Sequence, residues 1–180
     1  LDGVAHHVAH HPAALALDTI HDLAHSKGAD PSLGNQMEDQ NRLQFEAGTA
    51  AFELNYPYVY PSAKADVPDI FKNMKWTTYP TVKAGHPARV TIGGINLAVG
   101  EFSKHKAQAF AAIQCLRNPQ NEIRNAVLGG LPPVLEKIYS QPAFQKAYPM
   151  WKAIFATLKN ASVRPKTPAY QSVSLQISYT

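Results

Sequence analysis

Asn55, Tyr56 and Tyr58 bring an amide and two phenol rings close together in the sequence. They come directly after residues 49–54, a short and mostly apolar run that is typical of a strand buried on both faces. Open α/β sheets bind ligands outside the carboxyl ends of their strands. Ring faces can stack on the C–H surface of a sugar, and an amide can bond to two of its hydroxyl groups. We therefore predict a binding site for a small polyhydroxylated solute; the alternatives are rim packing for the tyrosines and a turn at Asn55.

Two glycines and an arginine further along the chain have properties that suit the same kind of ligand. Gly93 and Gly94 lack a Cβ atom, so a ligand can approach their backbone N–H groups; a tight turn between two strands is the alternative. Arg164 offers five donors in a planar fork that matches paired sugar oxygens, whereas a surface salt bridge is the other explanation. Tyr170 lies shortly after Arg164 and adds another ring.

Motifs of catalysis are missing from the sequence, which contains no nucleophile elbow, phosphate loop or HExxH pair. Two carboxylates, Glu53 and Glu101, lie near the predicted site and are of the type that a glycosidase uses as acid and base. A single carboxylate in a strand is usually structural, so we predict a binding protein that uses no cofactor and is not an enzyme. A carbohydrate-processing enzyme is the alternative.

Histidines at i,i+4 spacing suggest a different chemistry, because two imidazoles on one helix face can hold a metal ion. The pairs are His6/His10, His7/His11 and His21/His25. No thiolate or carboxylate accompanies them at a fixed spacing, and Pro12 interrupts the first run. We therefore predict a solvated histidine-rich segment over residues 1–12 and no metal site, with a histidine-based metal-binding module as the alternative.

The composition is that of a folded protein, since 45% of the 180 residues are apolar and 17% are charged. The net charge is +4, but the basic residues are scattered, which argues against a nucleic-acid-binding protein. No apolar run approaches the roughly 20 residues that span a membrane. The single cysteine, Cys115, excludes an intrachain disulfide. It lies in the apolar pattern AFAAIQCL, which predicts a buried side chain.

The elements that would position these residues follow from the apolar spacing. Gly48 is expected to end a helix in a left-handed conformation, and Ser103 to cap another. Residues 163–168 are expected to form an extended crossing, and residues 170–180 fit either a strand or a helix. Strands are predicted at residues 49–54, 89–92 and 95–99, and helices at residues 13–26, 38–47, 68–74, 103–116, 122–128, 134–139 and 142–159.

Several short motifs follow one another in an order that points to a known family. FEAGTAAF occupies residues 45–52, and NYPY follows at Asn55. Later in the chain come Gly93-Gly94-Ile95-Asn96 and Arg164-Pro165. These are similar to F-x-x-G-x-A-A-M, N-G-P-W, G-G-x-x-x-A-I and R-P segments, so the chain resembles the carboxyl-terminal lobe of maltose-type solute-binding proteins of ABC importers. Tyr58 takes the place of the family's sugar-stacking tryptophan.

This resemblance implies an α/β fold for residues 13–180: one lobe of a two-lobed periplasmic-binding-protein-like fold, with helices packed on a mixed sheet. It also implies that the chain is a piece of a longer protein, because the family's amino-terminal lobe and lipid-attachment cysteine have no counterpart in the sequence. The resemblance assigns ligand contacts to Asn55, Tyr56, Tyr58, Gly93, Gly94, Ile95, Arg164 and Tyr170.

Within the family, the segments NYPYVYPSAKAD, VTIGGINLAVG and SVRPKTPAYQSVS are most similar to the trehalose-recycling lipoproteins of mycobacteria. That resemblance implies trehalose or a related disaccharide as the ligand, and the permease subunits of an ABC importer as partners. It implies an extracytoplasmic location, with the parent protein anchored to the cell membrane by a lipid. Closure of the two lobes around the sugar would form the state that the importer recognises.

Overall fold

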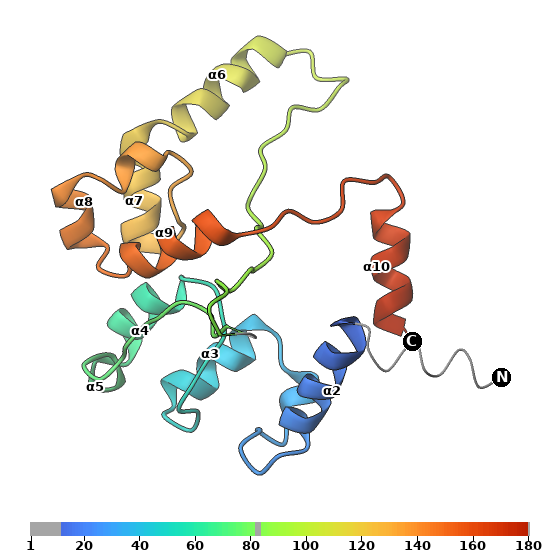
Figure 1. The fold of residues 1–180 in the computed structure, drawn as a ribbon. Coiled ribbons are helices and arrows are strands. Elements are labelled where there is room, and N and C mark those ends of the chain that lie inside the picture. The colour runs from blue at the N-terminus through green and yellow to red at the C-terminus, as the bar shows by residue number, and fades with distance from the viewer. Residues whose placement is uncertain (1–11, 82–83, 180) are drawn as a thin grey trace. The chain divides into compact units, whose positions relative to one another are not determined.

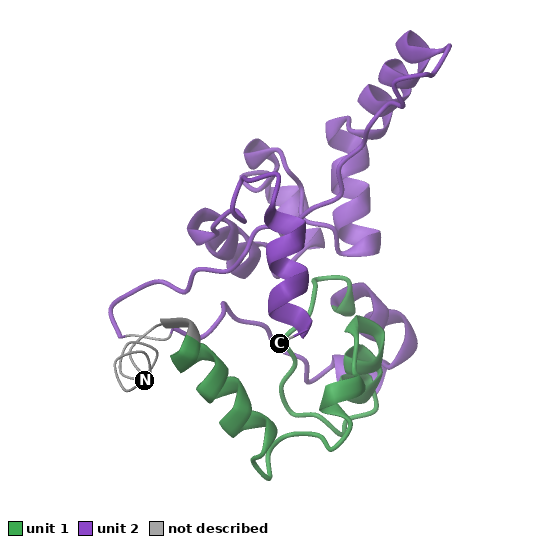
Figure 2. Ribbon diagram, turned by 90° about the vertical axis from the view of Figure 1, so that its right-hand side faces the viewer, with its two compact units in different colours: residues 1–59 green, residues 60–180 purple. Residues whose placement is uncertain are grey.

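The computed structural model describes residues 12–81 and 84–179, which form helices joined by long extended connections (Figure 1). The chain divides into two compact units, residues 1–59 (unit 1) and residues 60–180 (unit 2) (Figure 2). The elements are, in order, α2 (Pro12–Ala24), η1 (Leu33–Asn35), α3 (Glu38–Glu46), α4 (Val59–Asp66), α5 (Pro68–Phe71), α6 (Lys106–Leu116), α7 (Pro119–Gly129), η2 (Glu136–Ile138), α8 (Pro142–Ala147), α9 (Trp151–Asn160) and α10 (Tyr170–Tyr179).

Unit 1 contains α2, η1 and α3, and both of its predicted helices are confirmed. The apolar side chains of α2, which the spacing placed on one face, are more than half exposed. α3 ends as predicted, because Gly48 has a φ of 74° in the left-handed region. The N–H of Thr49 then bonds to the carbonyl of Gln44 over 3.2 Å. This glycine stop directs the chain into the segment that carries Asn55.

The hydrophobic core of unit 2 is built from aromatic rings on α4, α8, α9 and the chain around η2. Two phenol hydroxyls inside it are satisfied by backbone carbonyls: Tyr139 donates to Pro133 over 2.9 Å, and Tyr148 donates to Gly130 over 3.2 Å. Burial raises the pKa of both phenols, which keeps them neutral donors. The buried members of the core are Tyr60, Ala126, Ile138, Tyr139, Phe144, Tyr148 and Met150.

Glu122 on α7 holds the connection that follows this helix in place. Asn118 caps the start of the helix, and Gly130 ends it with a φ of 69°. The side chain of Glu122 is buried, and its Oε2 accepts hydrogen bonds from the N–H groups of Val134 (3.1 Å) and Leu135 (3.2 Å). The predicted helix over residues 122–128 is therefore confirmed within α7, and one carboxylate fixes the chain that follows it.

The helix predicted over residues 142–159 is in fact two helices. α8 ends before Pro149 and α9 begins after it. Proline has no N–H to donate, and its ring disfavours the helical conformation of the residue before it. Tyr148 accordingly has φ −127° and ψ 73°. The prediction of a single helix was wrong because the apolar stripe continues across this break.

Two predictions around α6 are wrong. The helix begins at Lys106, and Ser103 does not cap it, since the Ser103 Oγ instead accepts a bond of 3.2 Å from the N–H of His105. The Cys115 side chain is exposed rather than buried. Phe110 on the same helix is also more than half exposed. Apolar spacing indicates a helix face but does not show that another element covers it.

The mixed sheet predicted for this fold is not formed by residues 12–81 and 84–179. Residues 49–54, 89–92 and 95–99 are not strands, and the β contact of this part of the chain is an isolated parallel bridge between Thr91 and Ser162. A strand is stable only when a neighbouring strand takes up its backbone N–H and C=O groups. Residues 170–179, which fitted a strand or a helix, form α10.

Candidate functional site

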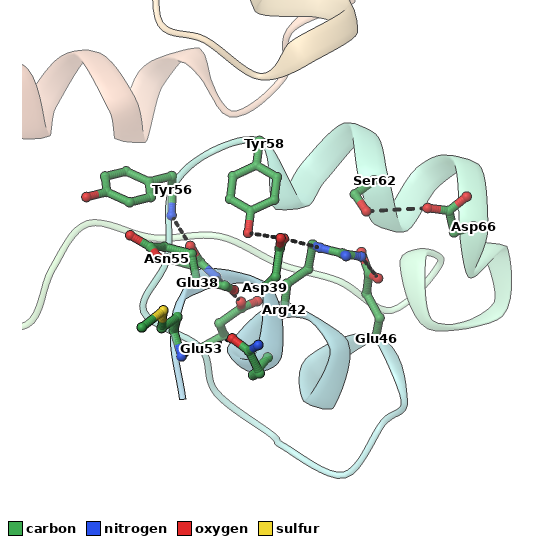
Figure 3. Close-up of polar contacts among 12 residues, drawn as sticks. Glu38, Asp39, Arg42, Glu46, Glu53, Asn55, Tyr56, Tyr58, Ser62 and Asp66 are labelled. Atoms are coloured by element: carbon green, nitrogen blue, oxygen red, sulfur yellow. Dashed lines mark hydrogen bonds and ion pairs between the residues drawn. The ribbon is translucent and has the colours of Figure 1, made fainter. Parts of the chain in front are cut away.

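Hydrogen bonds of the Asn55 side chain connect the segment after α3 to the start of that helix (Figure 3). Its Nδ2 donates to the carbonyl of Glu38 (2.8 Å) and to Oε1 of Glu53 (2.7 Å). Its Oδ1 accepts from the N–H of Tyr56 over 2.7 Å. Both ends of the amide are thus engaged within unit 1. These contacts match the turn-forming role of Asn55 better than the role of an amide open to a ligand.

Tyr58 lies at one end of a row of polar contacts along α3 (Figure 3). Its hydroxyl donates to Oδ1 of Asp39 over 3.2 Å, and Arg42 Nε donates to the same oxygen over 3.4 Å. Arg42 also bonds through Nη1 to Oε2 of the buried Glu46 over 2.5 Å. Burial, together with the Asp39 carboxylate, raises the pKa of Tyr58 above its ordinary value. The row fixes the position of the Tyr58 ring and keeps its hydroxyl protonated.

A hollow of about 470 Å³, open to solvent, lies beside these residues. Its volume is within the usual range for small-molecule sites, roughly 300–1,000 Å³. Tyr56 is 62% exposed, so its ring face is accessible. Ring faces next to carboxylates and an amide combine the flat apolar surface and the polar groups that a sugar requires. The lining residues are Met37, Glu38, Asp39, Gln40, Tyr56 and Tyr58.

Sequence reasoning missed the contribution of α3 to this hollow. Glu38 and Asp39 open the helix, where acidic side chains complement the helix dipole. The Gln40 Oε1 accepts a bond of 3.1 Å from the N–H of Met37. Each of these residues is therefore explained locally as part of a helix start. The contact that joins them to the site, between Asn55 and the Glu38 carbonyl, links positions that are distant in the sequence.

In unit 2, Gly93, Gly94 and Ile95 lie on an exposed connection without regular structure. A Cβ atom added to either glycine would meet nothing within 4 Å, and neither glycine has a left-handed backbone. The tight turn that was the alternative explanation of these glycines is therefore not seen. Their backbone is open to approach, and Ile95 is 77% exposed.

Arg164 lies on the connection between α9 and α10 in unit 2. Figure 1 shows this connection crossing the one that carries Gly93. The crossing is held by the parallel bridge, in which the N–H of Ile92 bonds to the carbonyl of Ser162 over 2.9 Å. Arg164 is exposed and makes no ion pair with any described residue, so the surface salt bridge considered for it is not present.

The structure thus places the predicted residues in two groups, one in each unit. Asn55, Tyr56 and Tyr58 form the first group, in unit 1. Gly93, Gly94, Ile95 and Arg164 lie on the two connections that cross in unit 2, and Tyr170 is the half-buried first residue of α10. All residues of the first group belong to unit 1, and all residues of the second group belong to unit 2.

The two carboxylates considered as an acid and base also belong to different units. Glu53 is half-buried in unit 1, and Glu101 is exposed in unit 2. Burial raises the pKa of Glu53, an effect that the hydrogen bond from Asn55 partly opposes. This bond gives Glu53 a structural role in holding the Asn55 turn.

Replacing Glu53 by glutamine is expected to change how stability depends on pH. A carboxyl whose pKa is raised by folding favours the folded state below its ordinary pKa, and this contribution is lost as the pH rises through the raised value. Glutamine cannot ionise, and its carbonyl can still accept from Asn55. Denaturant unfolding across this pH interval should therefore show Glu53→Gln gaining stability relative to the parent as the pH rises. Glu101→Gln is the matched exposed control, and a gap that is the same at every pH would contradict the prediction.

The histidine pairs His6/His10 and His7/His11 lie outside the described residues. Among residues 12–81 and 84–179, no group of three or more His, Cys, Asp or Glu side chains is placed to hold a metal ion. No helix in that part of the chain is both long and apolar enough to cross a membrane.

Two known proteins are similar to this chain over most of its length. A probable ABC transporter-binding protein of Deinococcus radiodurans is 29% identical over 155 residues, which cover 86% of this chain and 36% of that protein. The structure of maltose-bound T. maritima MalE3 matches with a TM-score of 0.83 and 26% sequence identity, over 91% of this chain and 43% of that one. The chain therefore spans less than half the length of each of these relatives.

The structural match shows that this chain has the fold of part of a maltose-binding-type protein, although the described residues lack the predicted sheet. The model of a family of binding proteins, not enzymes, matches residues 15–155, well over half of the chain. This match confirms the family suggested by the short motifs. The chain belongs to the bacterial extracellular solute-binding proteins.

Proposed function

We propose that this chain contributes sugar contacts to an extracytoplasmic solute-binding protein that delivers its ligand to an ABC importer. The observation that carries the proposal is the hollow on unit 1, where Tyr56 and Tyr58 stand beside the carboxylates of Glu38 and Asp39. Membership of the solute-binding family and the likeness to a maltose-bound protein support a sugar as the solute. The hollow offers both apolar faces and hydrogen-bonding groups, which a disaccharide requires.

A second set of contacts is proposed from unit 2. The exposed N–H groups at Gly93 and Gly94 are approachable donors, and Ile95 supplies an apolar side chain beside them. Arg164 presents a guanidinium that is not engaged in an ion pair with any described residue. Paired sugar hydroxyls would bond to this planar fork, and Tyr170 would add a ring at the start of α10.

The complete binding site is proposed to form in a longer, two-lobed protein, because this chain covers 43% of the maltose-bound relative. Closure of the lobes around the sugar would add contacts that exist only in the closed state, and the sugar would therefore stabilise that state. The extended segments at residues 49–54 and 89–99 would pair there with strands of the remaining chain, completing a mixed sheet. The importer's permease subunits would recognise the closed form.

Trehalose or a related disaccharide is the proposed ligand, and the parent protein is proposed to be a mycobacterial-type lipoprotein. These finer assignments rest on the similarity of the segments that begin at Asn55 and surround Gly93 and Arg164. Covalent change of the sugar is not part of the proposal, because binding and release are sufficient for delivery.

The 180-residue chain is expected to bind trehalose far more weakly than the longer protein that contains it, because only part of the contacts is present. Calorimetry with trehalose, maltose and sucrose on both proteins would measure the difference. Tight trehalose binding by the longer protein and weak binding by the chain is the expected result. Equal affinities would contradict a two-lobed site, and failure of the longer protein to bind any of the three sugars would overturn the proposed ligand class.

The enzymatic alternative is tested on the same samples. A carbohydrate-processing enzyme would convert a disaccharide to products, and Glu53→Gln or Glu101→Gln would abolish that conversion. A solute-binding protein returns the sugar unchanged, which chromatography of the incubated mixture would show.

A further inference from the structure

α2 carries a pair of histidines that the proposed sugar site does not use. His21 and His25 are four residues apart, both are exposed, and their ring centroids are 4.2 Å apart with an interplanar angle of 29°. Residues at this spacing lie on the same side of a helix. The N–H of His25 bonds to the carbonyl of His21 over 3.0 Å, so helical geometry extends to the second ring.

Hydrogen bonds determine which nitrogen of each ring is available. The Nδ1 of His25 lies 2.9 Å from the carbonyl oxygen of His21, and a carbonyl can only accept, so this nitrogen carries the proton. The Nδ1 of His21 lies 3.4 Å from the carboxylate of Asp22, which is likewise an acceptor. In a neutral imidazole the other nitrogen then holds a lone pair. Both rings therefore present Nε2 as the free acceptor.

This arrangement is the one that metal-binding histidines use. A ligating imidazole usually donates its second N–H to a carbonyl or carboxylate, which fixes the tautomer and orients the ring. A tetrahedral zinc ion bound about 2.0–2.1 Å from each nitrogen needs the two nitrogens about 3.3 Å apart. The two rings are stacked, with centroids 4.2 Å apart, so the exposed side chains must turn out of the stack before both in-plane lone pairs point at one ion.

We propose that His21 and His25 form a two-histidine clamp for a divalent late transition-metal ion, bound through the two Nε2 atoms. Water completes the coordination, since no third His, Cys, Asp or Glu among the described residues is placed to join it. Copper(II), nickel(II) and zinc(II) are the ions that favour imidazole. The bound ion links the last turn of α2 to the residue that follows it, independently of any sugar.

The test uses the full 180-residue chain with His6, His7, His10 and His11 replaced by asparagine, so that the other histidine pairs do not contribute. Titration with copper(II), nickel(II) and zinc(II) is followed by calorimetry, and copper binding also by its visible absorption. Binding of one ion per chain is expected. His21→Ala and His25→Ala should each weaken it about tenfold or more, because the second imidazole acts on an ion already held beside it.

Two control variants separate the clamp from single-histidine binding. His105→Ala removes an exposed histidine outside α2 and should leave the affinity unchanged. The double variant His25→Ala/Leu23→His keeps the number of histidines but places them two residues apart, where they do not face each other; it should bind as weakly as His25→Ala. Acidification should release the ion, because protons compete for the same nitrogens. Unchanged affinity in His25→Ala, or parental affinity in the double variant, would overturn the clamp.

Discussion

Replacing Phe144 by alanine is expected to destabilise the chain by about 3–5 kcal/mol, the usual cost of removing a buried phenylalanine ring. Phe144 is only 1% exposed. Its ring stacks on that of Tyr148 at a centroid distance of 5.2 Å and meets the edge of Tyr139 at 5.7 Å. The truncation removes these contacts and leaves a cavity inside the core of unit 2. Denaturant unfolding followed by circular dichroism measures the loss.

Phe102→Ala is the matched control, because the same ring is removed from a position that is 93% exposed. Its effect should stay within about 0.5 kcal/mol, as for most surface substitutions. Similar losses in the two variants would show that the rings around Phe144 do not form the core of unit 2.

Arg164→Ala is expected to weaken sugar binding by about 1.5–3 kcal/mol in the longer protein, the range for hydrogen bonds to a charged group. This expectation depends on the proposed function. Arg164 makes no ion pair with a described residue, so its removal should leave the free energy of unfolding nearly unchanged. Calorimetry of trehalose binding, together with denaturant unfolding, separates the two effects.

Arg124→Ala provides the comparison, since Arg124 is an exposed arginine on α7 outside both groups of predicted contacts. It should bind sugar like the parent. An Arg164→Ala protein with the parental dissociation constant would remove this side chain from the site while leaving the ring contacts of unit 1 open to separate test.

Sequence patterns predicted the helices best, because a helix is specified by neighbouring residues. The apolar spacing of α3 and the glycine at position 48 are local signals, and the structure follows both. The break at Pro149 was visible in the sequence but was outweighed by the longer apolar stripe around it. Single residues with a strong backbone preference thus carry more information than the stripe that contains them.

Strands and buried faces were predicted poorly, because they depend on partners elsewhere in the chain. Residues 49–54 have the composition of a strand, yet no described strand pairs with them. Cys115 fits an apolar helix face, yet its side chain is exposed among the described residues. The same limit applies to the hollow on unit 1. Tyr56 and Tyr58 were predicted from their type, whereas Glu38 joins them through a contact with Asn55 that the sequence does not reveal.

Pro149, which separates α8 from α9, allows the Tyr139 ring in the core of unit 2 to contact aromatic rings on both helices. The Tyr139 ring lies 5.7 Å from that of Phe144 on α8 and 4.8 Å from that of Phe155 on α9. In an unbroken helix these two phenylalanines would be about 16 Å apart along the axis, too far for a single phenol to touch both. Because the helix breaks at Pro149, a short sequence places one aromatic ring from each of two helices against Tyr139.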